Sequence, residues 1–289
     1  MKGLILAGGT GTRLWPITRV LSKQLLPIYD KPLIYYPLST LMLAGIQEVL
    51  IITTLGDSKI YRDLLGDGAV IGMKISYAIQ ERPEGLAQAL IIGETFLGQD
   101  KFAMILGDNF FYGAGLPSIL ETSKEFNGAQ IFVYEVSNPK DYGVLALGID
   151  GKPESVIEKP ISTKSKLAIT GLYFFDSNSI KYAKKATPSD RGELEITYVI
   201  NQYLNEGTLN FTRLSRGTAW LDTGNPNSLH DAASFVRIIE ERTGSKIGCI
   251  EEIAWRKKWI TNNKLFEIID TFGNSEYGKY LNRLVINNE

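Results

Sequence analysis

A glycine-rich segment with two nearby cations is the part of the sequence best suited to binding phosphate. The run from Leu6 to Leu14 reads LAGGTGTRL, and it is followed by Lys23. Glycines let backbone N–H groups approach phosphate oxygens without a Cβ in the way. The guanidinium of Arg13 and the ammonium of Lys23 would suit a polyphosphate. The structural alternative is a tight turn after a first strand, flanked by solvated cations.

Three familiar phosphate loops do not match this segment. A Walker loop needs Gly-Lys-Ser/Thr five residues after its first glycine, where Arg13 and Leu14 stand. A dinucleotide fingerprint needs a third glycine at the position of Leu14. A protein-kinase loop needs a Val-Ala-Ile-Lys strand downstream, and the sequence has none. The remaining form is a Gly-Gly-x-Gly-Thr-Arg loop.

Two aspartates each follow an apolar run and could hold a hard metal ion. Asp108 follows the run Phe102–Gly107, and Asp222 stands in the segment AWLDTG. Two carboxylates from different strands can bind Mg²⁺ while its other positions are left for water and phosphate oxygens. The spacing between them does not establish that they meet. Capping of a turn or of a helix start is the alternative role for each.

Composition narrows the chemistry further. Lys and Arg number 31 against 32 Asp and Glu in 289 residues, so no basic excess favours a nucleic-acid partner. The single cysteine, Cys249, excludes an internal disulfide, and the single histidine, His230, excludes a two-histidine metal site. No apolar run reaches membrane-spanning length and no cleavable signal pattern opens the chain, so we expect a cytoplasmic protein with no membrane partner.

The elements that must position these residues follow an alternating pattern in the first half of the chain. Short apolar strands are predicted at Gly3–Ala7, Glu48–Thr54, Lys74–Gln80 and Phe102–Gly107. Helices are predicted between them at Leu33–Ala44, Ser58–Leu65 and Gly85–Phe96. This alternation is typical of βαβ units in a doubly wound parallel sheet, whose ligands bind beyond the carboxyl ends of the strands.

After about residue 128 the pattern changes. Strands are predicted at Gln130–Val136, Val144–Ile149, Glu154–Glu158 and Leu167–Phe175, with Asp150-Gly151 as a hairpin signal. A long helix is predicted at Asn225–Arg242, with Gly244 as its C-cap, and the last forty or so residues read as helical.

The predicted fold class is therefore α/β. A doubly wound, mostly parallel (Rossmann-like) mixed sheet is flanked by helices and followed by a small antiparallel part and a helical C-terminal segment. We expect residues 1–240 to form a catalytic domain with halves at about 1–128 and 129–240, and residues 241–289 to form the helical segment.

Seven motifs together carry a family resemblance that covers the chain from residue 3 to about 284. They are Gly8–Leu14, Ser22–Pro32, Leu106–Asn109, Glu158–Pro160, Gly171–Asp176, Arg191–Thr197 and Trp220–Gly224. In this order they resemble the sugar-1-phosphate nucleotidylyltransferases, and most closely the members that use dTTP and glucose 1-phosphate.

The resemblance implies a reaction. The phosphate of glucose 1-phosphate attacks the α-phosphorus of dTTP in line, with Mg²⁺, and dTDP-glucose and pyrophosphate form as the first step of dTDP-rhamnose or deoxysugar synthesis. It also implies a homotetramer and feedback by a dTDP-sugar. The alternatives are a uridylyltransferase using UTP, a metal-dependent glycosyltransferase of related fold, and a nucleotide-sugar-binding regulator without catalysis.

The resemblance also implies roles for individual residues. For catalysis these are Arg13, Lys23 and Lys159; for the metal, Asp108 and Asp222. The nucleotide set is Leu6, Gly8, Gly9, Gly11, Thr12, Arg13, Gln80, Gly85 and Asp108. The sugar-phosphate set is Asn109, Gly143, Glu158, Lys159, Ile169, Gly171, Tyr173, Arg191 and Trp220. A regulatory site would use Tyr112, Gly113, Glu252 and Arg256, whose alternative role is helix packing.

Four of these residues have alternatives that the sequence leaves open. The Gln80 amide can donate and accept at a base edge, and Gly85 could instead begin a helix. Glu158 and Lys159 are neighbours on a strand and should face opposite sides, unless Pro160 ends the ladder. Arg191 could equally form a salt bridge within its own Arg-Gly-Glu turn.

Overall fold

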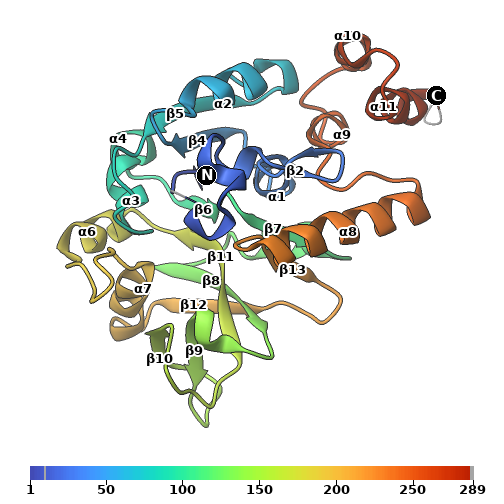
Figure 1. Ribbon diagram of the computed structural model, residues 1–289. Coiled ribbons are helices and arrows are strands. Elements are labelled where there is room, and N and C mark those ends of the chain that lie inside the picture. The colour runs from blue at the N-terminus through green and yellow to red at the C-terminus, as the bar shows by residue number, and fades with distance from the viewer. Residues whose placement is uncertain (10, 287–289) are drawn as a thin grey trace.

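A nine-stranded mixed sheet runs through the middle of the molecule (Figure 1). This computed structural model describes residues 1–9 and 11–286. The strands of the sheet are β1 (Lys2–Leu6), β4 (Glu48–Thr53), β5 (Lys74–Ile79), β6 (Phe102–Leu106), β8 (Ala129–Glu135), β9 (Gly143–Leu147), β10 (Pro153–Glu158), β11 (Leu167–Phe175) and β12 (Leu209–Arg213). Their order is β10-β9-β11-β6-β1-β4-β5, with β8 pairing β11 and β12 pairing β8.

The two halves of the sheet differ in strand direction, as the sequence predicts. Strands β6, β1, β4 and β5 are mutually parallel. Strand β11 runs antiparallel to β6, β8 and β9, and the Asp150-Gly151 turn joins the antiparallel pair β9 and β10. The predicted change after residue 128 is therefore confirmed as the change from parallel to mostly antiparallel pairing.

Eleven α-helices surround the sheet in the described part of the chain. They are α1 (Tyr35–Leu43), α2 (Ser58–Leu65), α3 (Gln88–Ile92), α4 (Glu94–Leu97), α5 (Leu116–Thr122), α6 (Asn178–Lys185), α7 (Ile196–Asn205), α8 (Pro226–Thr243), α9 (Ile250–Arg256), α10 (Asn262–Phe272) and α11 (Glu276–Ile286). None of the helices described is both long enough and apolar enough to cross a membrane.

Alternate residues of the parallel strands fill two separate cores. Leu4 and Leu50 join the core covered by α3, α6 and α7, whereas Ile5 and Ile51 join the core covered by α1 and the C-terminal helices. Complete burial of one such side chain contributes about 1.5–3 kcal/mol. Both faces of these strands are apolar because both are covered.

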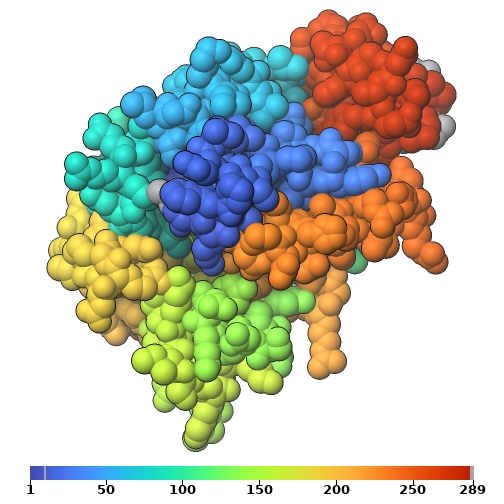
Figure 2. Space-filling model, in the orientation of Figure 1, coloured from blue at the N-terminus to red at the C-terminus, as the bar shows by residue number. Residues whose placement is uncertain are grey.

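The C-terminal helices lie beside the N-terminal half rather than beside β9 and β10. Helix α9 packs on α1, and in Figure 2 the red C-terminal residues protrude at the upper right, away from the green β9 region. Helix α8 begins with a capping box, in which Asn225 accepts from the Ser228 N–H, and ends at Gly244 in the left-handed conformation. The predicted ends of this helix are confirmed.

One helix predicted as continuous is interrupted in the structure. The segment Gly85–Phe96 forms two short helices, α3 and α4, that meet at Gly93. Gly85 lies outside both, with a φ of +111°. A Cβ at Gly85 would lie 2.5 Å from the backbone of Leu194, so a glycine is needed there for two chain segments to approach each other.

A two-stranded sheet outside the main sheet decides where the two aspartates lie. Strands β7 (Asn109–Tyr112) and β13 (Ala219–Asp222) pair antiparallel, with Asp222 opposite Asn109. Thr223 then donates to the Asp108 carbonyl from its N–H at 3.2 Å and from its hydroxyl at 2.9 Å. This pairing brings two segments that are far apart in sequence to the carboxyl end of β6. Strands β2 (Pro27–Ile28) and β3 (Lys31–Pro32) form a second small sheet.

Candidate active site

The glycine-rich segment lines a cavity of about 340 Å³. We call it the loop cavity, and its walls are Leu6, Gly8, Gly9, Gly11, Thr12, Arg13, Lys23, Gln80, Pro83, Gly85, Leu86, Glu193 and Gly224. All predicted nucleotide-binding residues except Asp108 lie in these walls. Arg13 is exposed and forms no ion pair with any residue that the structure describes, so its charge is available to a ligand.

Gln80 lies directly over the first glycine of the loop. A Cβ at Gly8 would lie 2.2 Å from Gln80 Oε1, so the glycine leaves the space that this amide occupies. The side chain is 5 % exposed, and its Nε2 donates to Gln88 Oε1 at 2.6 Å. Gly8 therefore serves the positioning of a side chain as well as the approach of its own backbone.

The Asp108 carboxylate is held by two side chains. Lys23 Nζ forms an ion pair with Oδ2, and Asn109 Nδ2 donates to Oδ1 at 3.0 Å. Burial alone would raise the pKa of Asp108, but the Lys23 ammonium and the hydrogen bonds from Lys23 and Asn109 together hold that pKa below its usual value. Asp108 is therefore ionised in the folded protein at neutral pH.

The Asp222 carboxylate differs from that of Asp108 in its hydrogen bonding and in the direction of its pKa shift. Its Oδ1 is buried without a hydrogen-bond partner among the described residues. Burial, and next the negative charge of Asp108, raise the pKa of Asp222 to about 6, although Lys23 and Arg13 partly offset them. Lys23 and Arg13 offset only part of the repulsion between the two carboxylates, and the unpartnered oxygen leaves Asp222 able to bind a further cation.

These residues fit a magnesium ion better than a transition metal. Mg²⁺ prefers hard oxygen ligands and is usually bound by one or two carboxylates together with substrate phosphates and water. In the described ranges 1–9 and 11–286, no cluster of three or more His, Cys, Asp or Glu side chains could enclose a metal by itself. Asp108 and Asp222 therefore suit a metal whose remaining ligands come with the substrate.

A second cavity, of about 320 Å³, opens beside the ends of β10 and β13 and the middle of β11. We call it the sheet cavity. Its walls include all of the predicted sugar-phosphate residues, namely Asn109, Gly143, Glu158, Lys159, Ile169, Gly171, Tyr173, Arg191 and Trp220. Both cavities are lined by Arg13, Leu86 and Glu193, and the sheet cavity is also lined by Asp222. The two cavities thus adjoin at Arg13, beside the aspartates.

Glu158 and Lys159 both reach the sheet cavity although they are neighbours in sequence. Strand β10 ends at Glu158, and Lys159 adopts a positive φ of 39°. This backbone conformation breaks the strand alternation, so the two side chains can line one cavity. A non-glycine residue in this region carries strain, and such strain is found preferentially at functional sites.

Arg191 forms the internal salt bridge that the sequence left open and also lines the sheet cavity, whereas its contact with a sugar phosphate stays a prediction. Its guanidinium donates to Glu193 at 2.5 Å and lies 3.3 Å from Glu195, so the internal salt bridge exists. It also lies 3.7 Å from Glu158 in the sheet cavity. Burial and next the nearby Glu195 raise the pKa of Glu158, partly offset by Lys159 and Arg191.

The Asn109 amide joins three strands behind Asp108. Its Oδ1 accepts from the Trp220 indole at 2.6 Å and from the Gly171 N–H at 3.1 Å, and its Nδ2 faces Asp108. A Cβ at Gly171 would lie 2.6 Å from this amide, so only glycine fits there. Trp220 is itself packed between Tyr134 and Tyr142.

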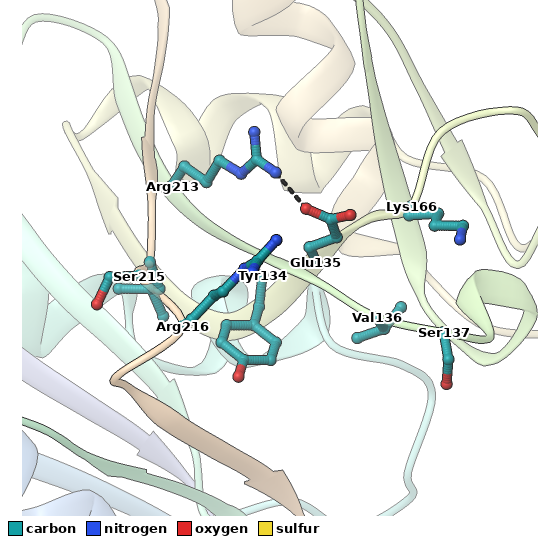
Figure 3. A pocket seen from close by; sticks show the side chains of 9 residues that line it. Tyr134, Glu135, Val136, Ser137, Lys166, Arg213, Ser215 and Arg216 are labelled. Atoms are coloured by element: carbon teal, nitrogen blue, oxygen red, sulfur yellow. Dashed lines mark hydrogen bonds and ion pairs between the residues drawn. The ribbon is translucent and has the colours of Figure 1, made fainter.

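A third hollow, of about 500 Å³, lies outside both cavities (Figure 3). Its walls come from the ends of β8 and β12 and include Lys166, Arg213 and Arg216. Arg213 and Glu135 form an ion pair across it, as the dashed line in Figure 3 marks. No residue that the sequence analysis predicted to be functional lines this hollow.

The four residues of the predicted regulatory site come from two separate regions, Tyr112 and Gly113 at the end of β7 and Glu252 and Arg256 on α9. Tyr112 packs on Phe235 of α8, with ring centroids 5.9 Å apart, and Gly113 lies against Gly217. Glu252 and Arg256 pair with each other on α9 at 2.7 Å. These contacts leave the regulatory site a prediction.

The sequence analysis missed several residues that line the sheet cavity and one that supports the wall of the loop cavity. Gln88 holds Gln80, and Glu193, Glu195, Thr197 and Tyr142 line the sheet cavity. Three of the five, Glu193, Glu195 and Thr197, lie within the motif Arg191–Thr197. Tyr142 carries no sequence signal, because only folding brings it against Trp220, at 5.1 Å between ring centroids.

Comparison with known proteins places the chain among nucleotidyl-transferring enzymes. A family model described as "Nucleotidyl transferase" matches residues 2–238. A curated glucose-1-phosphate thymidylyltransferase of Neisseria meningitidis is 51% identical over 286 residues, which cover 99% of each chain. Another, of Mycolicibacterium smegmatis, is 52% identical over 285 residues, again covering 99% of each chain.

Solved structures agree on the fold. A Bacillus anthracis protein assigned as a glucose-1-phosphate thymidylyltransferase, in complex with sucrose, superposes with a TM-score of 0.75 at 39% identity, covering 82% of this chain and 95% of that one. A UDP-glucose pyrophosphorylase complexed with UDP-glucose gives a TM-score of 0.73 at 23% identity, covering 82% and 98%, which supports the fold alone.

Proposed function

We propose, from the premise that this chain belongs to the glucose-1-phosphate thymidylyltransferases of the nucleotidyl transferase family, that it transfers a thymidylyl group from dTTP to glucose 1-phosphate. An oxygen of the sugar phosphate forms a bond to the α-phosphorus, and the bond from that phosphorus to the bridging oxygen of the β-phosphate breaks. The products are dTDP-glucose and pyrophosphate. The single observation that carries this proposal is the junction of the two cavities at Arg13, beside the paired aspartates.

Charge is the main obstacle to this reaction. The reactants together carry about six negative charges near neutral pH, so catalysis of phosphoryl-type transfer consists mostly of positioning and charge neutralisation. No general base is required, because the attacking phosphate oxygen is already ionised. This requirement agrees with a site built from carboxylates, lysines and an arginine.

The leaving diphosphate would lie in the loop cavity. The glycine backbone and the exposed Arg13 would bind its oxygens there, and Lys23 would add a second positive charge. Asp108 and Asp222 would hold Mg²⁺, which when bound would neutralise negative charge on the reacting phosphates. The unpartnered Oδ1 of Asp222 supports this assignment.

The sugar phosphate would lie in the sheet cavity. Lys159 would bind its phosphate and hold it toward Arg13, and Glu158 would accept hydrogen bonds from sugar hydroxyls. Arg191 is already neutralised by three glutamates, so we assign it to holding Glu158 and Glu195 in place and only secondarily to the phosphate.

The finer expectations belong to the same proposal. They are a cytoplasmic homotetramer that supplies dTDP-rhamnose or deoxysugar synthesis, and dTDP-sugar feedback through Tyr112, Gly113, Glu252 and Arg256. Residues 1–240 would carry catalysis and residues 241–289 would serve assembly.

One assay tests the proposal. Pyrophosphate release is measured with dTTP, UTP, dCTP and ATP against several sugar 1-phosphates, with Mg²⁺ and with excess EDTA. We expect release from dTTP with glucose 1-phosphate only when Mg²⁺ is present. Sugar transfer to an acceptor without pyrophosphate release would identify a glycosyltransferase, and a preference for UTP would identify a uridylyltransferase. Binding of dTDP-glucose without any turnover would identify a regulator.

A further inference from the structure

A chain of three side chains ends at the amide of Gln80. Glu84 lies just before α3, and Gln88 is the first residue of that helix. Gln88 Oε1 accepts from the Glu84 N–H at 3.1 Å, and Gln88 Nε2 donates to Glu84 Oε2 at 2.8 Å. Gln88 Oε1 also accepts from Gln80 Nε2 at 2.6 Å.

The orientation of the Gln88 amide is fixed by groups that cannot reverse their roles. A backbone N–H can only donate and an ionised carboxylate can only accept. If the Gln88 amide were flipped, its NH₂ group would face the Glu84 N–H and its oxygen would face the Glu84 carboxylate. Both contacts would be repulsive, so Glu84 sets the direction of Gln88.

Gln88 in turn sets the direction of Gln80. Because Gln88 presents an oxygen, Gln80 must present its NH₂ group to it, and its own oxygen is turned toward Gly8 in the loop cavity. Among the described residues none donates a hydrogen bond to Gln80 Oε1. A ligand in the loop cavity therefore meets a free acceptor and, beside it, the second N–H of the same amide.

This arrangement distinguishes pyrimidine bases by chemistry rather than by size. Thymine and uracil present an N3–H donor next to a carbonyl acceptor, which complements an amide oxygen next to an N–H. Cytosine presents an N3 acceptor next to an amino donor, so it would complement only the flipped amide. We propose that Gln88 is a specificity-determining positioning residue, which keeps Gln80 in the orientation that accepts thymine or uracil and rejects cytosine. This inference rests on the proposed nucleotide role of the loop cavity.

Equilibrium binding of dTTP and dCTP to the full chain, measured by calorimetry in EDTA, tests the proposal without any turnover. For the wild type we expect a dCTP dissociation constant well above that for dTTP. In Gln88→Met the amide of Gln80 can turn freely, and the ratio of the two constants should fall about tenfold, which corresponds to one neutral hydrogen bond. The KM for glucose 1-phosphate should stay unchanged, because Gln88 does not line the sheet cavity.

A charge-exchanged variant separates positioning from a merely structural role. In the double variant Glu84→Gln/Gln88→Glu, the new carboxylate at position 88 accepts hydrogen bonds from the backbone N–H of residue 84, from the new amide at position 84 and from Gln80. The orientation of Gln80 is therefore retained. Selectivity should therefore return to within about twofold of the wild type. Gln47→Met, at an exposed glutamine whose side-chain amide donates to the Gly72 carbonyl at 2.9 Å, is the matched control and should not change the ratio.

Three results would overturn the inference. They are an unchanged ratio in Gln88→Met, a loss of selectivity in the exchanged double variant equal to that in Gln88→Met, and a wild type that binds dCTP as tightly as dTTP. None of these binding results requires catalysis. A wild type that discriminates as expected but releases no pyrophosphate would instead contradict the proposed function and leave the role of Gln88 supported.

Discussion

Buried charge is used in two different ways in this molecule. Near the C-terminal helices, Asp30, Lys31, Glu240 and Lys246 form a cluster that we call the clamp, in which Glu240 lies 3.0 Å from Lys31 and 3.1 Å from Lys246. Asp30 pairs with both lysines, and the Ile247 N–H also donates to Glu240, at 2.9 Å. Two negative and two positive groups satisfy one another.

The aspartates of the candidate active site are not satisfied in this way. Asp108 has partners for both oxygens, but one buried oxygen of the neighbouring Asp222 has none in the described part of the chain, and its pKa is raised to about 6 by burial and by Asp108. The clamp joins the β2–β3 turn to the end of α8 and stabilises the fold. The pair Asp108 and Asp222, which we call the open cluster, lowers the stability of the fold and leaves a carboxylate oxygen free for a ligand. This difference distinguishes a structural charge cluster from a functional one.

The largest predicted effect is a loss of folding stability when the clamp is broken. Lys31→Met removes the buried partner of the buried Glu240 and leaves Glu240 and the partly exposed Asp30 with only Lys246 between them. Removal of one partner from a buried ion pair typically costs about 3–5 kcal/mol. The free energy of unfolding, measured with urea, should fall by that amount. The double variant Lys31→Met/Glu240→Gln should recover much of the loss. A change below about 1 kcal/mol in Lys31→Met would show that the clamp does not stabilise the fold.

The next effect is on the open cluster. Asp108→Asn or Asp222→Asn should keep the fold and lower kcat for pyrophosphate release by roughly a hundredfold or more, by analogy with the loss of one electrostatic catalytic group. Asp150→Asn, in the exposed turn between β9 and β10, is the matched control and should keep wild-type kcat. Near-normal turnover by either site variant would contradict the assignment of the aspartates.

A smaller effect should show that the two cavities bind different substrates. Lys159→Ala removes a cation from the sheet cavity only, so the KM for glucose 1-phosphate should rise about tenfold, as expected for one charged hydrogen bond, while dTTP affinity stays within about twofold. Lys152→Ala, at an exposed lysine next to Gly151, controls for net charge. An equal loss of affinity for both substrates would contradict the division of roles.

The smallest predicted effect is an increase in thermal stability when a site residue is replaced. The fold raises the pKa of Asp222 from about 4 to about 6. Above that pH range the ionised carboxylate is less favourable in the folded than in the unfolded protein, which lowers the free energy of unfolding. In metal-free buffer at pH 8, Asp222→Asn should therefore raise the melting temperature, by about 2–4 °C for roughly 1 kcal/mol. The gain should shrink as the pH falls below about 6 and vanish only below about 4, where the carboxyl is protonated in both the folded and the unfolded state. A lower melting temperature at pH 8 would show that the open cluster carries no such cost.

The sequence predicts the parallel strands because their burial on both faces makes them continuous apolar runs, as in β4 and β6. It also predicts the members of the loop cavity that follow β1 directly. It does not predict that Lys23 binds Asp108, that β7 pairs with β13, or that Gln88 holds Gln80. These are contacts between side chains or strands brought together only by the fold, and no local periodicity encodes them.

The most direct test of the account is the binding of Mn²⁺, followed by electron paramagnetic resonance of the free ion, in the presence of dTTP. We predict that the wild type binds the ion and that Asp222→Asn and Asp108→Asn each weaken binding at least tenfold, whereas Lys31→Met leaves it unchanged in the fraction that remains folded. Equal Mn²⁺ affinity in the wild type and in Asp222→Asn would contradict the central claim that the unpartnered carboxylate oxygen is a metal ligand.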